Sequence, residues 1–391
     1  MRILLITDWT AEEGGIETYL RQLRAGLEAA GDDVRLLVSD LGTGARKAEH
    51  VARGYRSAVA QSVTQLLNPS ALRTLHAAVA RFRPDVAHVS SFELQLSPLA
   101  LRALGRTPFV HSVAWYKPRC PTGHKLWPDG TRCLVRRGRV CLGAGCLGPV
   151  RFGRETVRYA LVERAAGRAA EVVACSEHVR AWLRREGVAS VHVPWPVAQP
   201  APAFRRSRAR SPLFVAAGRI SREKGLETLV GALADLRGRG IDARARLVGD
   251  GPSRGAVVAR ARALGVEGAL EVTGWLPHAE VERHLTEAWA LVAPSLWAEP
   301  LGLSAVEAIL RGVPVVASAE GGYAETVVPG RTGLLFPNGD AAALAARLAE
   351  VATGEAFAGG VDDGEAAALA TRHRPEAHVA SIRRIFGEVA G

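Results

Sequence analysis

Short apolar segments alternate with helical patterns along this chain, and the alternation runs twice, once on each side of a proline-rich stretch. In the first run, Arg2–Thr7, Val34–Val38 and Asp85–Val89 have the length and composition of buried strands, and residues 16–27 repeat apolar side chains at helical spacing. Further strands are expected at 108–112 and 172–174. Strands that alternate with helices indicate a parallel sheet with helices on both faces.

The pattern restarts after four prolines and a run of arginines in residues 194–208. Further strands are then expected at Phe214–Ala217, Ala245–Val248, Val272–Gly274, Ala290–Ala293 and Val313–Ala317, with a helix over Leu226–Leu236. The sequence therefore predicts an α/β fold of two doubly wound, Rossmann-like domains, 1–195 and 213–372, joined by a linker over 196–212. Residues 373–391 should form a helix that packs back on the first domain, with a second chain as the competing partner. Ligands in such sheets bind beyond the carboxyl ends of the strands, which places the active site in a cleft between the domains.

Composition indicates a globular protein, with 48% hydrophobic and 23% charged residues among 391. The first apolar run is too short for a signal peptide, and no run reaches the length of a membrane span. We therefore expect a cytoplasmic protein, with peripheral contact to the inner face of the membrane as an open alternative. Residues 101–210 carry 21 Lys and Arg against 6 Asp and Glu, whereas the remainder carries 29 against 33. This charge favours a phosphorylated substrate, an acidic lipid headgroup or a nucleic acid as partner, although a solvated arginine-rich face fits it equally well.

One predicted strand-to-helix turn, Gly218–Gly225, carries two cations, Arg219 and Lys224. Only four of the 50 basic residues are lysines, so a lysine at this point suggests a need for a compact cation. Backbone N–H groups at a helix start attract anions, and two cations of different shape suit a diphosphate. The alternative is a structural turn in which Arg219 pairs with Glu223 or Glu227. The residue spacing of a P-loop does not occur here.

Two glutamates, Glu299 and Glu307, stand eight positions apart at the opening of a predicted helix. Glu299 precedes a proline and should lie in a loop with its acid group free, whereas the apolar neighbours of Glu307 turn it inward. An inward carboxylate is costly unless something hydrogen-bonds it, and a polyhydroxylated ligand such as a sugar would do so. A surface helix with two unremarkable acids is the alternative. Glycosidases also pair two carboxylates, but they have no use for Arg219 and Lys224.

Six motifs follow one another in a fixed order. They are Gly-Gly-Ile-Glu-Thr at 14–18, Gly-Arg-x4-Lys-Gly at 218–225, Leu-Val-Gly-Asp-Gly-Pro at 247–252, Gly-Trp-Leu-Pro at 274–277, Glu-x7-Glu at 299–307, and Gly-Gly-Tyr-Ala-Glu at 321–325 leading to 332–336. In order and spacing the chain resembles the retaining nucleotide-sugar glycosyltransferases of family 4, over nearly its whole length and most densely in 213–340. The resemblance implies the GT-B fold: two Rossmann-like domains that face a central cleft, with a C-terminal helix that crosses back.

The resemblance also implies how the donor is held. Arg219 and Lys224 would hold the diphosphate, Glu299 the hydroxyls of the donor sugar, and Glu307 those of the nucleotide ribose. The backbone N–H groups of Leu303 and Ser304 would face phosphate, Gly15 would close on it from the first domain, and Trp275, Leu276 and Pro277 would lie against the base. Two adjacent glycines at 14–15 are by themselves more often just a tight turn.

For catalysis, the resemblance pairs Glu299 with His111, which is expected at the end of its strand near the anomeric carbon. Taken alone, such a histidine is more often a structural hydrogen-bonder. No bound metal is expected, since cations and helix termini would offset the diphosphate charge. Catalysis would then rest on positioning and on electrostatic stabilisation of the leaving group. The acceptor hydroxyl, from a glycan, a lipid-linked or a small molecule, would attack on the leaving-group face and give its proton to a departing phosphate oxygen.

Residues 112–150 form an insert that departs from the family pattern. Its four cysteines are Cys120, Cys133, Cys141 and Cys146. Without a Cys-x2-Cys pair, three interpretations stay open: a structural zinc with His124 as a further ligand, reduced packing cysteines, or a disulfide, which a cytoplasmic location disfavours. Because the insert follows His111 in the domain that receives the acceptor, we expect it to shape acceptor recognition, with Lys117 and Lys125 meeting an anionic group.

Two rival functions are weighed against a glycosyltransferase. Another enzyme of the same architecture, such as a nucleotide-sugar epimerase, would turn over donor with no acceptor present. A nucleic-acid-binding protein would use the basic 101–210 segment and a cysteine-held metal, and would bind DNA or RNA in a salt-sensitive way. The second rival leaves the motifs after residue 213 unexplained, and the arginines of the basic segment lack interleaved aromatic residues for base stacking.

Overall fold

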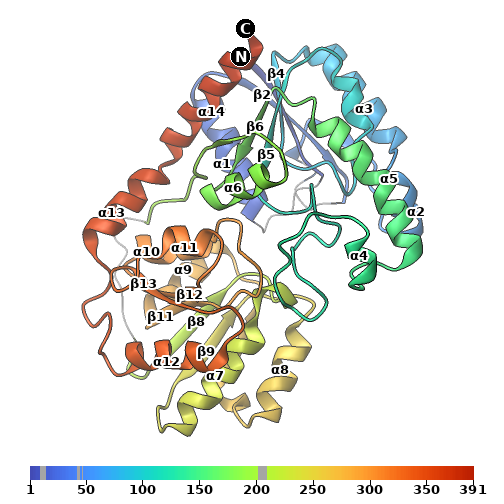
Figure 1. The fold of residues 1–391 in the computed structure, drawn as a ribbon. Coiled ribbons are helices and arrows are strands. Elements are labelled where there is room, and N and C mark those ends of the chain that lie inside the picture. The colour runs from blue at the N-terminus through green and yellow to red at the C-terminus, as the bar shows by residue number, and fades with distance from the viewer. Residues whose placement is uncertain (9–14, 42–44, 46, 201–208) are drawn as a thin grey trace. The chain divides into compact units, whose positions relative to one another are not determined.

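The computed structural model describes residues 1–8, 15–41, 45, 47–200 and 209–391. The chain divides into two compact units: the first is Met1–Pro128, Leu134–Pro196 and Pro375–Gly391, and the second is Asp129–Cys133 and Val197–Arg374. The predicted linker lies partly outside the described residues, because 201–208 are not among them. Each unit contains one parallel sheet with helices packed on it (Figure 1).

The sheet of the first unit has the order β3-β2-β1-β4-β5-β6-β7, with parallel pairing throughout. Its strands are β1 Arg2–Ile6, β2 Asp33–Ser39, β3 His50–Ala52, β4 Val86–Val89, β5 Phe109–Val113, β6 Glu171–Ala174 and β7 Val191–His192. Its helices are α1 Gly15–Ala29, α2 Ala58–Thr64, α3 Pro69–Phe82, the 3₁₀ helix η2 Ala100–Leu104, α4 Val140–Gly143, α5 Pro149–Ala166, α6 Glu177–Arg185 and α14 Pro375–Ala390. Strand β1 is central, and Ile3 pairs with Val34 on one side and Val86 on the other.

The sheet of the second unit has the order β10-β9-β8-β11-β12-β13 and is also parallel. Its strands are β8 Leu213–Ala217, β9 Arg244–Val248, β10 Leu270–Gly274, β11 Ala290–Ala293, β12 Val315–Ser318 and β13 Gly333–Phe336. Its helices are η3 Arg222–Lys224, α7 Leu226–Gly238, α8 Arg254–Ala263, η4 Glu267–Ala269, α9 His278–Glu287, α10 Leu303–Leu310, α11 Gly322–Thr326, α12 Ala341–Ala352 and α13 Asp363–Arg372. The predicted architecture of two doubly wound parallel sheets is confirmed.

Three strands, β3, β7 and β13, have no counterpart in the sequence prediction, and each lies at an edge of its sheet. An edge strand has one neighbour and can be short, so it leaves a weak apolar signal. Strand β7 consists of two residues, neither of them fully buried, and β13 opens on a glycine, which weakens a strand pattern. The central strands were predictable because both of their faces are covered, which demands near-continuous apolar runs.

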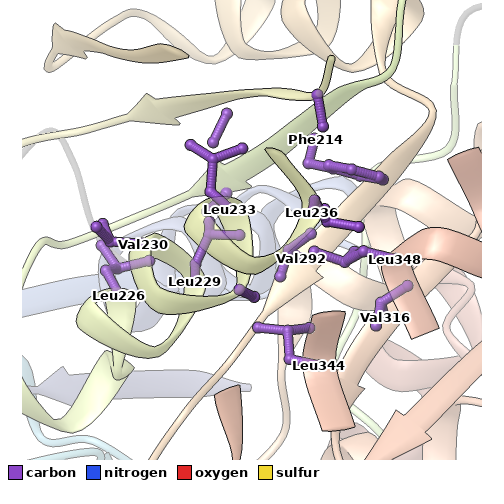
Figure 2. Packing of buried hydrophobic residues seen from close by; sticks show 14 of the residues in the cluster. Phe214, Leu226, Leu229, Val230, Leu233, Leu236, Val292, Val316, Leu344 and Leu348 are labelled. Carbon is purple, nitrogen blue, oxygen red and sulfur yellow. The ribbon is translucent and has the colours of Figure 1, made fainter. Parts of the chain in front are cut away.

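Helix α7 supplies much of the core of the second unit. Its inward-facing residues are Leu226, Leu229, Val230, Leu233 and Leu236 (Figure 2). They belong to one cluster with Phe214 of β8, Val292 of β11, and Leu344 and Leu348 of α12. Truncating one of these leucines to alanine should cost about 2–5 kcal/mol of stability. This packing holds β8 in place, and the carboxyl end of β8 leads directly into the turn at 218–225.

Helix α14 packs on α1 within the first unit (Figure 1). A Cβ added at Gly26 of α1 would lie 2.4 Å from Val379 Cγ2, so the glycine permits this close approach. The apolar face of α14 is buried, including Ile382 and Phe386, and Arg383 Nε lies 2.8 Å from Asp32 Oδ2. Among the described residues, no helix is long and apolar enough to cross a membrane.

The tip of the insert, Asp129–Cys133, groups with the second unit, whereas the sequence analysis assigned the whole of 112–150 to the first domain. Arg132 Nη1 lies 3.1 Å from Glu320 Oε1, and a Cβ at Gly130 would lie 3.6 Å from Arg222 Nη2. An ion pair between residues this far apart in the sequence leaves no local pattern, so its position could not be anticipated.

Candidate functional site

The turn after β8 is fixed by its backbone. Gly218 has a φ of 130°, and the Ile220 N–H donates to the Asp250 carbonyl at 2.8 Å. A Cβ at Gly249 would lie 2.0 Å from the Gly218 carbonyl oxygen, so only glycine lets the two loops meet this closely. Arg219 is exposed and forms no ion pair with any described residue, so the alternative pairing with Glu223 or Glu227 is not formed. Its guanidinium is therefore available to an anion.

Lys224 and Glu299 form a direct ion pair beside this turn. Lys224 Nζ lies 2.7 Å from Glu299 Oε2, which also accepts hydrogen bonds from Trp297 Nε1 at 2.8 Å and from Ser295 Oγ at 3.4 Å. Burial by itself would lower the pKa of Lys224, but the adjacent Glu299 carboxylate outweighs burial and raises that pKa above its usual value. Lys224 is thus a permanent cation here.

Glu299 lies in a loop as predicted, but its acid group is not free. One carboxylate oxygen, Oε2, takes three donors, whereas Oε1 accepts no hydrogen bond from the described residues. The backbone of the loop is also fixed, because the Gly322 N–H donates to the Glu299 carbonyl at 2.6 Å. A Cβ at Gly321 would lie 2.3 Å from that same carbonyl oxygen, so glycine is needed at this position. The carboxylate is therefore fixed in orientation with one oxygen left for a ligand.

The start of α10 lies against Tyr323. Gly302, with a φ of 78°, precedes the helix, and a Cβ there would lie 2.3 Å from the Tyr323 ring. Burial raises the pKa of Tyr323 to about 12, and the neighbouring Ser295 and Ser304 side chains oppose this rise. The first N–H groups of α10, those of Leu303 and Ser304, have no partner inside the helix and carry its positive dipole end.

Several of these groups line a pocket that opens to solvent at the carboxyl ends of β8 and β11. Its lining includes Gly218, Arg219, Lys224, Ser295, Ser304 and Tyr323. It combines two cations, a helix start and hydroxyl groups, which is the chemistry that holds a phosphorylated ligand. Ser295, Trp297 and Tyr323 received no role from the sequence. Ser295 and Trp297 stand within four residues of Glu299, but no sequence pattern shows that their side chains reach its carboxylate.

A second group of predicted residues lies along α9 and α10. Glu307 is half-buried, and its carboxylate accepts no hydrogen bond from the described residues, while its backbone carbonyl accepts one from Arg311 Nη1 at 2.9 Å. Burial raises the pKa of Glu307, partly offset by the charges of His278 and Arg311, which shows that α9 faces it. Trp275, 47% exposed, lies in the turn that leads to His278, so the structure brings this turn toward Glu307. In the same turn, Leu276 contacts the apolar core and Pro277 caps α9.

The remaining predicted residues lie in the first unit. Gly15 is exposed and opens α1, while Gly14 lies outside the described residues. His111 is not at the end of its strand as predicted, because β5 continues two residues further to Val113. Burial, aided by Arg119, lowers the pKa of His111 to about 4, so the imidazole is neutral. Its Nε2 has no hydrogen-bond partner among the described residues.

The insert does not place Lys117 and Lys125 as expected. Lys117 Nζ donates to the Pro121 carbonyl at 2.7 Å, and Lys125 Nζ donates to the Val135 carbonyl at 2.7 Å and lies 3.2 Å from Glu186. Both ammonium groups therefore fasten the insert itself. Among the described residues, no group of three or more His, Cys, Asp or Glu is arranged to hold a metal ion, and the structural zinc stays a prediction.

Comparison with known proteins shows which chains have similar sequences. Residues 201–382 match the family model of glycosyl transferases group 1, and residues 14–196 match a glycosyl transferase 4-like domain. A 2-deoxystreptamine N-acetyl-D-glucosaminyltransferase of Streptomyces fradiae is 30% identical, over 89% of this chain and 85% of that protein. A 2-deoxystreptamine glucosyltransferase of Streptomyces kanamyceticus is 39% identical, but this match covers only 36% of each protein.

Solved structures show similar folds. A sucrose-phosphate synthase from Thermosynechococcus elongatus has a TM-score of 0.75 at 23% identity, over 99% of this chain and 98% of that one. Anabaena Alr3699/HepE, solved in complex with UDP, has a TM-score of 0.71 at 19% identity, over 99% of this chain and 100% of that one. At these identities the likeness establishes the fold alone, and that fold is GT-B.

Proposed function

The chain belongs to the glycosyl transferase group 1 family, and from this premise we propose that it is a retaining glycosyltransferase using a nucleotide-diphosphate sugar. The sugar would pass to a hydroxyl group of an acceptor. The observation that carries this proposal is the pocket in which the free guanidinium of Arg219 lies beside the Lys224–Glu299 pair. Cations that would bind a diphosphate therefore lie next to a carboxylate that would bind sugar hydroxyls.

The geometry supports distinct roles within the donor. Arg219, Lys224 and the first N–H groups of α10 would bind the diphosphate and stabilise the charge that develops on it as the glycosidic bond breaks. No bound metal is needed in this scheme, since these groups already offset the phosphate charge. The open Oε1 of Glu299 would accept hydrogen bonds from sugar hydroxyls, because Oε2 is already held by Lys224 and Trp297.

The nucleoside would lie toward α9. Glu307 has a half-buried carboxylate without a partner among the described residues, and two ribose hydroxyls would satisfy it. The exposed indole of Trp275 offers an aromatic face for the base, next to Leu276 and Pro277. UDP-containing donors are the first to test, because the similar Anabaena protein was solved with UDP.

Retention would follow from attack on the same face that the leaving group departs from. The acceptor oxygen forms the new bond to the anomeric carbon, the bond to the diphosphate breaks with its electron pair, and the acceptor proton passes to the departing phosphate oxygen. Positioning and electrostatics would lower the barrier, without a covalent enzyme intermediate on Glu299. In the first unit, we assign Gly15 to the phosphate and the unpartnered, neutral imidazole of His111 to the sugar.

The acceptor is proposed only as a class. The hydroxyl would belong to a glycan, a lipid-linked molecule or a small molecule. The similar Streptomyces proteins bear names that specify 2-deoxystreptamine, so this aminocyclitol belongs in the first acceptor panel. We place the reaction in the cytoplasm.

The test is a panel of uridine, guanosine, adenosine and thymidine diphosphate sugars, read by thermal shift and by donor hydrolysis. At least one should stabilise the protein and turn over, and failure of all would contradict the proposal. Turnover to an epimeric donor without acceptor would instead indicate the epimerase. The anomeric configuration of the product, read by NMR, tests retention.

Two variants then distinguish the residue that would bind the nucleotide from the residue that would bind the sugar. Glu307→Ala should weaken binding of the free nucleotide ten- to a hundredfold, because it removes hydrogen bonds to a charged group. Glu299→Ala should spare nucleotide binding and reduce sugar transfer. Glu355→Ala is the matched control, since Glu355 is an exposed acid of the same unit that lines neither end. If both site variants affected nucleotide and sugar equally, the assigned division would be wrong.

A further inference from the structure

Helices α2 and α5 of the first unit expose four valines to solvent. Val59 and Val63 of α2 are 79% and 65% exposed, and Val150 and Val157 of α5 are 89% and 55% exposed. The helices are neighbours, because Arg154 Nη1 of α5 donates to Ser62 Oγ of α2 at 2.5 Å. Arg154 stands at helical spacing between the two α5 valines, and Ser62 adjoins Val63. The valines therefore flank one contact and form one surface, the α2–α5 face.

Helix α4 adds to this surface. It packs against α5, and Figure 1 shows α2, α4 and α5 as neighbours within the first unit. Val140 and Leu142 of α4 are exposed, as are Leu134 and Val135 just before it. Exposed aliphatic side chains are scattered singly on most protein surfaces, so eight of them on adjoining segments call for an explanation.

Arginine is the predominant charge in these segments, although the later part of α5 also carries Glu155 and Glu163. Residues 50–84 and 130–154 contain five and six arginines, and neither segment contains a single Asp or Glu. Three of these arginines, Arg56, Arg139 and Arg151, are exposed and form no ion pair within the described part of the chain. Each stands close to the valines, before α2, before α4 and in the first turn of α5. The α2–α5 face thus combines apolar side chains with unneutralised positive charge.

The second unit shows that this exposure is not general. Within its described residues, the one large hydrophobic side chain that is as exposed is Trp275, which belongs to the candidate donor site. Many of its surface arginines pair with acids, as in Arg254 with Asp250 and Arg262 with Glu267, although some exposed arginines there have no ion pair among the described residues. The combination of exposed aliphatic side chains with unpaired arginines is therefore a local property of the α2–α5 face.

We propose that the α2–α5 face docks on the surface of an anionic lipid bilayer. Aliphatic side chains would enter the region below the headgroups, while Arg56, Arg139 and Arg151 would meet lipid phosphates. A second copy of the chain fits less well, since a twofold interface would set these arginines against themselves. A nucleic acid would satisfy the arginines but would gain nothing from the valines, and the face carries no exposed aromatic residue for base stacking.

Docking in this way goes beyond the proposed function and does not depend on it. The measurement needs neither donor nor acceptor: the whole chain is mixed with large unilamellar vesicles, which are then sedimented. Vesicles of phosphatidylcholine alone are compared with vesicles that also contain phosphatidylglycerol. The protein should sediment with the anionic vesicles, remain in solution with the zwitterionic ones, and be released in part by added salt.

Two variants test which surface binds. Replacing Arg56, Arg139 and Arg151 together by serine should weaken partitioning ten- to a hundredfold, since each cation near an anionic surface contributes separately. Replacing Val59, Val63, Val150 and Val157 by serine should make the remaining binding fully reversible by salt. The control replaces Arg244, Arg260 and Arg372, which are equally exposed arginines of the second unit without ion pairs among the described residues.

All of the substituted side chains are exposed, and unchanged thermal melts would show that the variants fold. The proposal is overturned if the protein does not sediment with anionic vesicles, or if the control variant loses binding as strongly as the arginine variant does. A dimer of the wild type in light scattering that the valine variant abolishes would assign the face to a second copy instead. If the wild type bound anionic vesicles but turned over no donor, the result would contradict the proposed function and leave the docking proposal intact.

Discussion

The two sheets share a central arrangement, yet the charged residues that follow their central strands are used differently. Asp8 is the second residue after β1, and Arg219 is the second residue after β8. Asp8 is buried, and its carboxylate accepts the N–H groups of Leu94, Gln95 and Leu96 at 2.7 to 2.9 Å. Arg219 is exposed and pairs with no described residue. The same position thus fastens a loop in one unit and faces a pocket in the other.

The next strand in each sheet repeats the contrast. Glu93, after β4, is fully buried near Arg158, which pairs with Glu155 at 2.7 Å. Glu299, after β11, keeps one carboxylate oxygen without a hydrogen bond from the described residues. A shared topology therefore does not decide what the charges at strand ends do, and each function has to be argued from the site.

The largest expected effect falls on the second unit. Lys224→Met removes the cation beside the diphosphate and leaves Glu299 without its partner, so kcat/KM for sugar transfer should fall about a hundred- to a thousandfold. Steady-state kinetics measure the loss, and a urea melt serves as the control, because Lys224 is only half-buried and the fold should persist. A large loss of stability with full activity per folded molecule would show that this charge, too, is structural.

The opposite outcome is expected for the first unit. Arg158 is 1% exposed and stacks on the Tyr159 ring at 4.3 Å, and Arg158→Met removes one of the two guanidinium groups paired with the buried Glu155 carboxylate, the other being Arg154 at 2.9 Å. Losing this charged hydrogen bond should cost about 1.5–3 kcal/mol in the free energy of unfolding. Urea unfolding measures the cost, and nucleotide binding per folded molecule should not change. If Arg158→Met left stability unchanged and impaired nucleotide binding, Arg158 would serve the ligand, and the contrast between the two units would be wrong.

The sequence could predict the features that have a local signal, but not those that depend on tertiary contacts. The apolar runs were sufficient for the central strands, and local motifs led to Arg219, Lys224 and Glu299, because each of these signals lies within a few residues. The burial of Tyr323 against Gly302 depends on loops that meet only in the folded chain, and the hydrogen bond from Trp297 to Glu299 depends on the conformation of the loop that both residues share. The engagement of Lys117 and Lys125 inside the insert was likewise invisible, since their partners are fixed by tertiary structure.

A smaller effect should appear in the pH dependence of stability. Burial, reinforced by the nearby Asp8 charge, raises the pKa of Glu93 from its ordinary value of 4.5 to about 7. The native state therefore keeps a proton that the unfolded chain releases between these values, and stability should fall as pH rises through that window. Glu93→Gln removes this dependence, which amounts to at most about 3 kcal/mol.

Unfolding free energies at about pH 5 and about pH 8 measure the difference. Glu93→Gln should be more stable than the wild type at about pH 8, and this advantage should be lost at about pH 5. Glu355→Gln, at an exposed acid, is the matched control and should follow the wild type at both. A profile of Glu93→Gln that runs parallel to the wild type would mean that Glu93 is not a buried protonated acid, and that the first unit handles its strand-end charges as the second does.

The smallest effect sharpens the comparison inside the donor pocket. Tyr323→Phe keeps the ring against Gly302 and removes only the hydroxyl, which lies near the Ser295 and Ser304 side chains. Ser304 is in the first turn of α10, so its N–H group would point less accurately at the diphosphate, and nucleotide affinity should fall about fivefold, the equivalent of one hydrogen bond. Isothermal titration measures this, with Tyr55→Phe in the first unit as control. If the melting temperature fell while affinity stayed constant, the hydroxyl would serve only to fasten α10, as Asp8 fastens its loop. If affinity fell at constant stability, the second unit would keep even its buried hydroxyl for the ligand.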